Sequence, residues 1–150
     1  MEIKPKTGIE RIYFGMSMAE ARAVWGDPEK ISTFIPLEDN SEDRSIDWEY
    51  SNGIELSFDS DDDFLLCSIT CESRLITLNG LTIIGLTPKE LKLRFPEVKL
   101  DDEFELAVDE YKLVNLELSF WVQKGKVYSV TIFPEYNELG NEIIWPKKSN

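Results

Sequence analysis

Residues 14–20 read Phe-Gly-Met-Ser-Met-Ala-Glu, and residues 84–90 read Ile-Gly-Leu-Thr-Pro-Lys-Glu. Both stretches place Ser or Thr three residues before Glu, which is the spacing of a capping box at the start of a helix. The same tetrapeptide, Glu-Leu-Ser-Phe, follows downstream of each stretch, at residues 55–58 and 117–120. Two matches in the same order predict one structural unit used twice, over about residues 9–75 and 78–135.

A short helix is predicted after each capping box. The apolar residues of the first helix fall on one helical face: Met18, Ala21, Val24 and Trp25. Residues 26–28, Gly-Asp-Pro, end this helix, because Gly suits the position just after a helix and Pro cannot continue it. In the second helix Leu91 and Phe95 share a face, and Pro96 ends it.

Strands are predicted after each helix. Apolar and polar residues alternate around Trp48 and Leu56, as in strands with one buried face, and Asn52-Gly53 between them is typical of a tight hairpin turn. A short strand could cover residues 31–35. The strands predicted for the two meanders cover residues 46–50, 54–58 and 64–72, and then 104–108, 111–122 and 126–133. The sequence therefore predicts a single α+β domain over residues 1–150. Two tandem units, each a helix plus a three-stranded meander, would form a curved antiparallel sheet with the helices on one face.

The composition predicts a cytoplasmic chain. Apolar residues make up 42% of the 150 residues, which is normal for a globular domain. No apolar run is long enough for a membrane helix, and Met1–Lys6 does not resemble a signal peptide. Cys67 and Cys71 stand four residues apart in a predicted strand, roughly 13 Å along it, so we expect two buried, unpaired thiols on one face.

The charge is strongly negative and unevenly placed. The net charge is −13, and eleven acidic residues between Glu38 and Asp63 face only Arg44. Such a surface repels nucleic acid and anionic membranes and attracts a basic protein. Trp121 is predicted to lie on the open sheet face, because its neighbour Phe120 would face the helices. The predicted partner-binding residues are Glu38, Asp39, Glu42, Asp43, Asp59, Asp61, Asp62, Asp63 and Trp121. The alternative is that the acidic residues only keep the surface solvated, and that the C-terminal tail covers Trp121.

Catalytic and metal-binding signatures are absent from the sequence. The chain contains no histidine, and it has no nucleophile motif or phosphate-binding loop. Residues 59–63 are rich in Asp, but Phe64 and Thr70 stand where a calcium loop needs Gly and Glu. We therefore expect no catalytic activity, no cofactor and no bound metal.

The run from Phe14-Gly15-Met16-Ser17 to Gly26-Asp27-Pro28, followed by antiparallel strands, resembles a known module. It is similar to the repeat of β-lactamase inhibitor proteins and of small outer-membrane assembly lipoproteins with the same general fold. This chain has no export signal, lipidated cysteine or paired cysteines. A cytoplasmic, acidic, inhibitor-like chain instead resembles the immunity proteins of bacterial toxin systems, and that resemblance implies tight neutralisation of one cognate toxin.

The leading hypothesis is an immunity protein against a basic toxin, such as a nuclease. The acidic stretch would steer the encounter, and Trp121 would supply buried contact area. One alternative is a structural or regulatory scaffold domain whose acidic surface serves only solubility. Another is a small-molecule binder that uses the concave face of the sheet.

Overall fold

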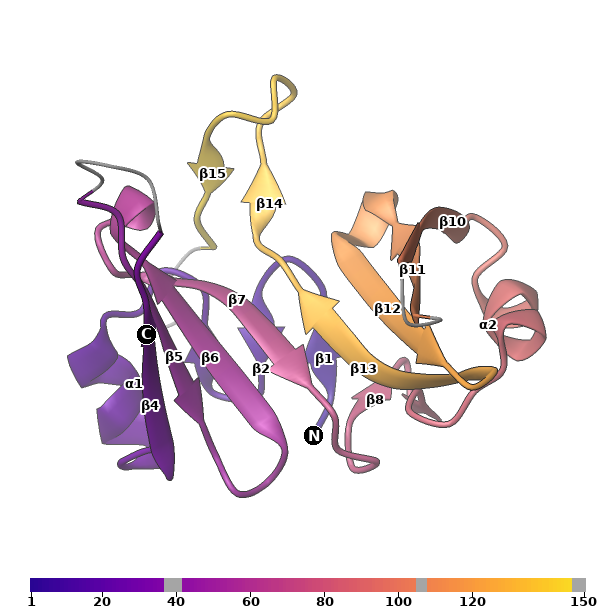
Figure 1. The fold of residues 1–150 in the computed structure, drawn as a ribbon, viewed down its shortest axis with the longest axis horizontal. Helices are drawn as coiled ribbons and strands as arrows, with labels where there is room; N and C mark the ends of the chain where they lie inside the picture. Colours follow the sequence, from indigo (N-terminus) through magenta and orange to yellow (C-terminus); the bar gives the residue numbers. More distant parts are fainter. Residues whose placement is uncertain (37–41, 105–107, 147–150) are drawn as a thin grey trace.

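A computed structural model of the chain describes residues 1–36, 42–104 and 108–146. Its main feature is one antiparallel sheet of eight strands (Figure 1). In chain order the strands are β4 (Lys30–Phe34), β5 (Ser45–Glu49), β6 (Ile54–Asp59), β7 (Leu66–Cys71), β10 (Lys99–Phe104), β11 (Val108–Leu113), β12 (Leu118–Gln123) and β13 (Lys126–Ile132). Within the sheet the order is β10-β11-β12-β13-β7-β6-β5-β4, so the two groups of strands join where β13 pairs with β7.

Two short helices begin at the predicted capping boxes. In α1 (Met18–Trp25) the Glu20 amide donates to Ser17 Oγ at 3.1 Å, and the Ser17 amide donates to Glu20 Oε1 at 3.2 Å. Thr87 and Glu90 exchange the same two bonds, both at 3.2 Å, at the start of α2 (Pro88–Arg94). Both predicted helix starts are confirmed. The boxes satisfy amide groups that a helix start otherwise leaves without partners.

Short hairpins complete the fold around the sheet. They are formed by β1 (Ile3–Lys4), β2 (Gly8–Ile9) and β3 (Ile12–Tyr13), by β8 (Thr77–Leu78) and β9 (Leu81–Thr82), and by β14 (Glu135–Tyr136) and β15 (Ile143–Ile144). The first group is buried through Ile3, Ile9 and Ile12. Gly8 is required there, because a Cβ at its position would come within 2.0 Å of the carbonyl oxygen of Ile12.

The core lies between one face of the sheet and the two helices with the first hairpins. Alternate residues of the central strands are buried on this face, as the period of two predicts: Ile54, Leu56 and Phe58 in β6, and Leu118, Phe120 and Val122 in β12. Each helix places a cation over an aromatic ring of the sheet. The Arg22 guanidinium lies 5.0 Å from the Trp48 ring, and Lys92 Nζ lies 5.6 Å from the Tyr111 ring.

The predicted α+β class, with tandem units of one helix and three strands, is wrong. The described residues contain only two α-helices, of 8 and 7 residues, and the chain is mostly β with one large sheet. Four strands, rather than three, follow each helix in the sheet. Residues 111–122, predicted as one strand, are divided by the 3-10 helix η2 (Val114–Leu116), after which Glu117 takes a left-handed conformation with φ of 54°.

The two Glu-Leu-Ser-Phe stretches do not occupy corresponding places. Residues 55–58 lie wholly within β6, whereas Glu117 precedes β12. A β-bulge follows Ser57 in the pairing of β6 with β7, and another follows Trp121 in the pairing of β12 with β13. When the two halves are aligned by their bulges, Trp121 corresponds to Ser57 of the first half. The sequence match, which pairs Trp121 with Asp59, is therefore out of register by two residues.

Candidate functional site

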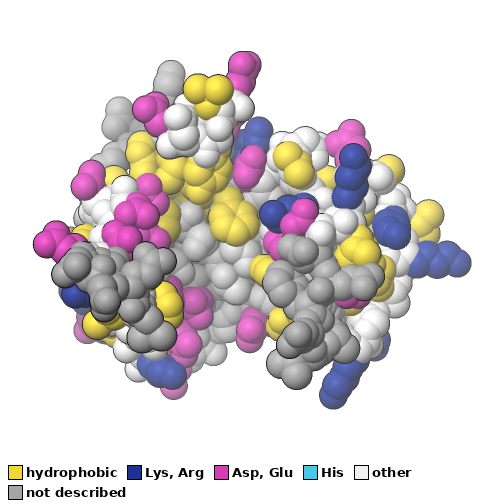
Figure 2. Space-filling model, turned by 45° about the horizontal axis from the view of Figure 1, so that its top comes forward, with side chains coloured by type: hydrophobic (Ala, Val, Ile, Leu, Met, Phe, Trp, Pro, Cys, Tyr) yellow, Lys and Arg dark blue, Asp and Glu magenta, His cyan; other side chains and the backbone are white. Residues whose placement is uncertain are grey.

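Charge is divided between the two ends of the sheet. Figure 2 shows acidic side chains gathered on the left of the molecule, near a band of apolar side chains below the C-terminal hairpin, whereas Lys and Arg side chains collect on the right. The acidic side corresponds to the end of the sheet that holds β4 to β7 (Figure 1). Negative charge is therefore concentrated at one end of the molecule, and the electrostatic attraction of a basic partner would be strongest at that end.

The densest group of carboxylates lies where β6 ends, and we call it the acidic corner: Asp43, Asp59, Asp61, Asp62 and Asp63. The 3-10 helix η1 (Ser60–Asp62) positions it. The Arg44 amide donates to Ser60 Oγ and the Ser60 amide donates to the Arg44 carbonyl oxygen, both at 2.9 Å. This reciprocal pair holds the segment before β5 against the end of β6.

Two carboxyl groups of the acidic corner, those of Asp61 and Asp62, have raised pKa values. The charges of Asp43 and then Asp59 raise the pKa of Asp61. The pKa of Asp62 is raised first by its partial burial and then by the charges of Asp59 and Asp61. A raised carboxyl pKa means that the negative form is disfavoured where it stands. A cation placed among these groups would relieve that repulsion.

A groove of about 520 Å³ runs from the acidic corner to the C-terminal hairpin. Its lining includes Asp61, Asp62 and Asp63 together with the aromatic residues Tyr136 and Trp145. Trp145 is held in place by close packing over the glycine at position 15, where a Cβ would meet its ring at 3.1 Å. Carboxylates beside aromatic faces suit Arg and Lys side chains, which can form ion pairs and stack on the rings.

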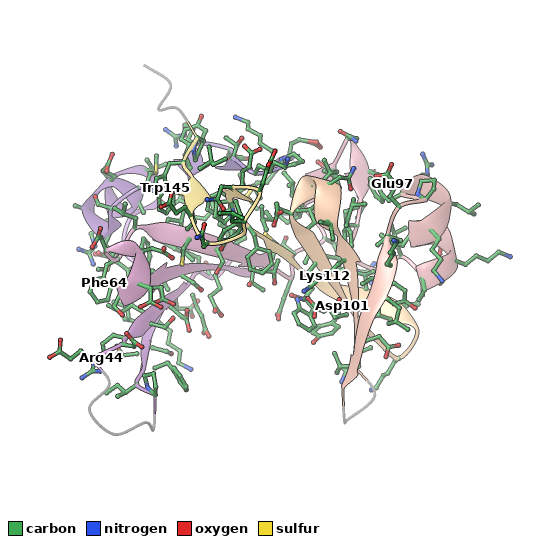
Figure 3. The ribbon with its side chains drawn as sticks, turned by 90° about the horizontal axis from the view of Figure 1, so that it is seen from above. Arg44, Phe64, Glu97, Asp101, Lys112 and Trp145 are labelled. Carbon is green, nitrogen blue, oxygen red and sulfur yellow. The ribbon has the colours of Figure 1, made fainter. Side chains whose placement is uncertain are left out.

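The second feature is the open face of the sheet. Figure 3 shows the sheet bent, with β4–β6 at one end and β10–β11 at the other turning toward the side away from the helices. A continuous polar row crosses all eight strands of this face, one residue from each strand: Lys30, Glu49, Glu55, Thr70, Thr131, Ser119, Lys112 and Lys99. The row is basic at its ends, acidic over β5 and β6, and neutral at the centre.

The acidic part of the open face is crowded too. Glu55 has a raised pKa because it is partly desolvated and because Asp47, Glu49 and Glu72 lie near it. A shallow depression of about 260 Å³ is lined by Glu49, Glu55 and Glu72 together with Tyr50 and Thr70, among others. These glutamates alternate along the chain with buried residues, and that period of two is the signal that could have shown their common face. None of these glutamates is among the predicted partner-binding residues.

In the other half of the open face, on β10 to β13, polar side chains form hydrogen bonds and an ion pair with one another. Trp121 Nε1 donates to Thr131 Oγ1 at 3.0 Å, and Ser119 Oγ donates to Glu110 Oε2 at 2.8 Å. Lys112 Nζ forms an ion pair with Asp101 Oδ2 at 3.2 Å, and both residues are labelled in Figure 3. Trp121 lies on the face opposite the buried Phe120, as predicted, but its side chain is half-buried rather than exposed.

The structure separates the predicted binding residues into two groups. Glu38 and Asp39 lie outside the described residues, and Glu42 is exposed just before Asp43. Trp121 and Asp59 are three strands apart in the sheet order and several residues apart along the strands, which places them roughly 20–25 Å from each other. The acidic residues and Trp121 therefore do not form one compact patch. Tyr136 and Trp145 line the groove beside the acidic corner, and neither is among the predicted partner-binding residues.

The cysteines are both free, but they do not share one face as predicted. Cys71 is buried in the core, whereas Cys67 is the extra residue of the β-bulge opposite Ser57 and Phe58. Burial raises the pKa of each thiol to about 12, and nearby carboxylates add to this effect at Cys67. Neither thiol is therefore activated as a nucleophile.

The described parts of the chain, residues 1–36, 42–104 and 108–146, lack both a metal-binding cluster and a membrane-spanning helix. Those parts contain no group of three or more acidic or sulfur side chains arranged to hold a metal ion. Neither helix in them has the length and apolar character needed to span a bilayer.

Comparison with known proteins identifies a shared fold and no family. No protein-family model matches the sequence, and no curated protein does either. The crystal structure of YfeY from Escherichia coli, described there as uncharacterized, is similar with a TM-score of 0.55 and 12% sequence identity. The similarity covers 85% of this chain and 97% of YfeY. At this identity the likeness concerns the fold alone.

Proposed function

We propose that this chain is a non-catalytic, cytoplasmic protein-binding inhibitor, an immunity protein that neutralises one cognate basic toxin such as a nuclease. The observation that carries the proposal is the groove that is lined by Asp61, Asp62 and Asp63 together with Tyr136 and Trp145. Aromatic residues beside charges are the usual composition of the energetically dominant part of a protein interface.

The electrostatics support a basic partner. The chain carries a net charge of −13, and its acidic corner is crowded enough to raise the pKa values of Asp61 and Asp62. Lys or Arg side chains of a partner would therefore gain attraction and also remove repulsion within this chain. Nucleases bind phosphates with basic side chains, and carboxylates of an inhibitor can occupy the positions that those phosphates take.

The aromatic side of the groove supports a lasting complex. Charges on an interface rim mainly speed association, whereas buried aromatic contacts slow dissociation. Tyr136 has 37% of its surface exposed and belongs to the protruding C-terminal hairpin, so a partner can cover its ring. In this proposal the acidic corner steers the toxin, and the aromatic rings retain it.

The direct test is a pull-down of the protein encoded beside this gene, at low salt and at about 0.5 M salt, where the Debye length is roughly 4 Å. The neighbour should be toxic when expressed alone, harmless when co-expressed with this chain, and bound more weakly at high salt. A neighbour that is neither toxic nor bound would sink the proposal.

A matched pair of triple variants locates the interface. The variant Asp61→Asn, Asp62→Asn, Asp63→Asn should slow association with the toxin. The control Glu29→Gln, Glu97→Gln, Glu138→Gln removes the same charge from exposed residues elsewhere and should leave association nearly unchanged. Equal slowing by both variants would mean that only the net charge matters, and the assignment of the groove would then be wrong.

A further inference from the structure

The two edges of the eight-stranded sheet are built differently. At one edge, the register of β10 shifts between Leu100 and Asp102, which marks a β-bulge. The sequence there also carries three consecutive acidic residues, at positions 101–103. Bulges and edge charges are the usual means by which proteins prevent another chain from pairing with an exposed strand.

The opposite edge, β4, has neither of these features. Its five residues pair with β5 in unbroken register, from Lys30 opposite Glu49 to Phe34 opposite Ser45. Lys30 is the only charged residue in the strand, and it stands at the first position. Among the strands that the structure describes, β4 has β5 as its neighbour on one side and stands at the edge of the sheet. Figure 1 shows β4 at the free left edge of the sheet, with α1 behind it.

Large apolar side chains are exposed along this edge. Ile31 is 55% exposed, Phe34 is 62% exposed, and Ile35, directly after the strand, is 54% exposed. Ile31 pairs with the buried Trp48 and so lies on the helix side of the sheet, whereas Phe34 pairs with Ser45 on the open side. The edge therefore offers apolar contacts on both faces, and no described strand pairs with its outer side. Together these features suit an extended peptide.

We propose that β4 is a docking edge that takes an extended, basic segment of a protein partner as an added antiparallel or parallel strand. The charge of the neighbouring strands identifies the partner. Ser32 is paired with Asp47 of the neighbouring strand β5. Phe34 is paired with Ser45 of β5, which is paired in turn with Asp59 of the acidic corner. Carboxylates of the open face therefore lie one and two strands away from β4.

The spacing of a sheet sets the sequence of the docked segment. Ser32 is small, and Asp47 lies two strand spacings, or about 10 Å, from the backbone of an added strand. An arginine placed opposite Ser32 can span that distance together with the aspartate side chain. Apolar residues would stand opposite Ile31 and Phe34. The docked segment therefore combines basic residues on the open side with apolar residues against the exposed side chains of β4.

A second copy of this chain fits the edge less well. Pairing two β4 strands would bring together the acidic ends of two molecules that each carry a net charge of −13. Like charges held close across an interface cost free energy, and salt would be needed to screen them. A basic segment meets the opposite condition, because the carboxylates behind β4 attract it.

This inference rests on the proposed function only in taking the partner to be basic, and it can be tested without the toxin. The probe is a peptide in which Val and Arg alternate, added at up to millimolar concentration to the full chain. Hydrogen exchange of the backbone amides is followed by NMR. Exchange of amides between Ile31 and Phe34 should slow with this peptide. It should not slow with a Val–Glu peptide or with a Val–Arg peptide interrupted by a central Pro.

A matched pair of double variants assigns the binding to the edge. Ile31→Lys with Phe34→Lys should abolish binding of the Val–Arg peptide, because edge lysines oppose strand addition. Leu75→Lys with Leu93→Lys changes two residues that are 70% and 73% exposed elsewhere, and it should leave binding intact. Equal loss in both double variants would overturn the inference, since binding would then depend on charge rather than on the edge.

The remaining outcomes are also decisive. No slowing of exchange in β4 at millimolar Val–Arg peptide overturns the inference. Protection of β4 that appears without peptide and grows with protein concentration also overturns it, because the occupant is then a second copy. If the toxin fails to bind the Asp61, Asp62, Asp63 variant but still binds the β4 variant, the proposed function stands and the inference that β4 is a docking edge is overturned. If the peptide binds at β4 but the chain has no toxin partner, the inference about β4 stands and the proposed function is wrong.

Discussion

Trp121 Nε1 donates a hydrogen bond to Thr131 Oγ1 at 3.0 Å, and Thr131 Oγ1 lies 3.3 Å from Thr70 Oγ1. These three side chains come from the adjacent strands β12, β13 and β7, so the contact spans the joint between the two halves of the sheet. The indole N–H of Trp121 is therefore bonded within the protein, and this bond links strands of the sheet.

Trp121→Phe should lower the free energy of unfolding by about 1 kcal/mol, because it removes the donor to the buried Thr131 while keeping an aromatic ring. Urea unfolding followed by circular dichroism measures this change. Tyr128→Phe, at a more exposed aromatic residue with 38% of its surface accessible, should stay within about 0.5 kcal/mol of wild type. Equal stability of the Trp121 variant and wild type would show that the bond has no net effect.

The two capping boxes should stabilise the fold separately. Ser17→Ala and Thr87→Ala should each lower the free energy of unfolding by about 1 kcal/mol, because each leaves a helix-start amide without its partner. The caps lie on different helices, so the double variant should lose nearly the sum of the two. Ser17→Asp, which can accept the same bond, is the control and should remain near wild type in the same urea titrations.

Glu55 should make stability fall as the pH rises. Its pKa is raised in the folded protein by desolvation and by Asp47, Glu49 and Glu72. The folded state therefore binds more protons than the unfolded state between the ordinary carboxyl pKa and the raised one, and across that window the free energy of unfolding decreases with pH. Glu55→Gln should stabilise the protein at neutral pH, and the gain should vanish below the ordinary carboxyl pKa. Thermal unfolding at pH 7 and at about pH 3.5 checks this.

Salt provides the control for the Glu55 prediction. Added salt screens the repulsion between the four carboxylates, so the gain from Glu55→Gln at neutral pH should shrink as the ionic strength increases. Glu138→Gln removes one exposed carboxylate from the C-terminal turn and should change the melting temperature very little. A gain that is the same at low and neutral pH would contradict the electrostatic cause.

The thiols should be unreactive in the folded protein. A pKa of about 12 leaves only about one part in ten thousand of each thiol ionised at pH 8. Iodoacetamide at that pH should label neither Cys67 nor Cys71 over a time in which glutathione is fully consumed. Unfolding in urea should make both react, as mass spectrometry of the intact chain would show. Rapid labelling of Cys67 without denaturant would mean that the bulge opens readily.

Local features were readable from the sequence. The capping boxes at Ser17 and Thr87, the turn at Asn52-Gly53 and the alternation in β6 all depend on residues within a few positions of one another. The orientation of Trp121 away from Phe120 follows from the same alternation. Each of these predictions rests on the stereochemistry of the backbone, which acts over one or two turns.

The fold class and the composition of the site were not readable in this way. The 3-10 helix η2 interrupts residues 111–122, and the left-handed position after it is occupied by Glu117 rather than by Gly or Asn, the residues that usually mark such a position. The bulge at Cys67 changed the face of one cysteine, and a single extra residue has no periodic signal. Trp145 and Asp62 line the same groove although 83 residues separate them in the chain.

By itself, the sequence determined where the helices begin, which residues of the central strands face inward, and that acidic residues concentrate in the first half of the chain. Only the tertiary structure decided that the two groups of strands join where β13 pairs with β7 through Val130 and Cys71, and that, among the described strands, β4 stands at one edge of the sheet. Strand order depends on the total apolar surface buried by the whole chain and on hydrogen bonds between distant segments. No local pattern of residues encodes it.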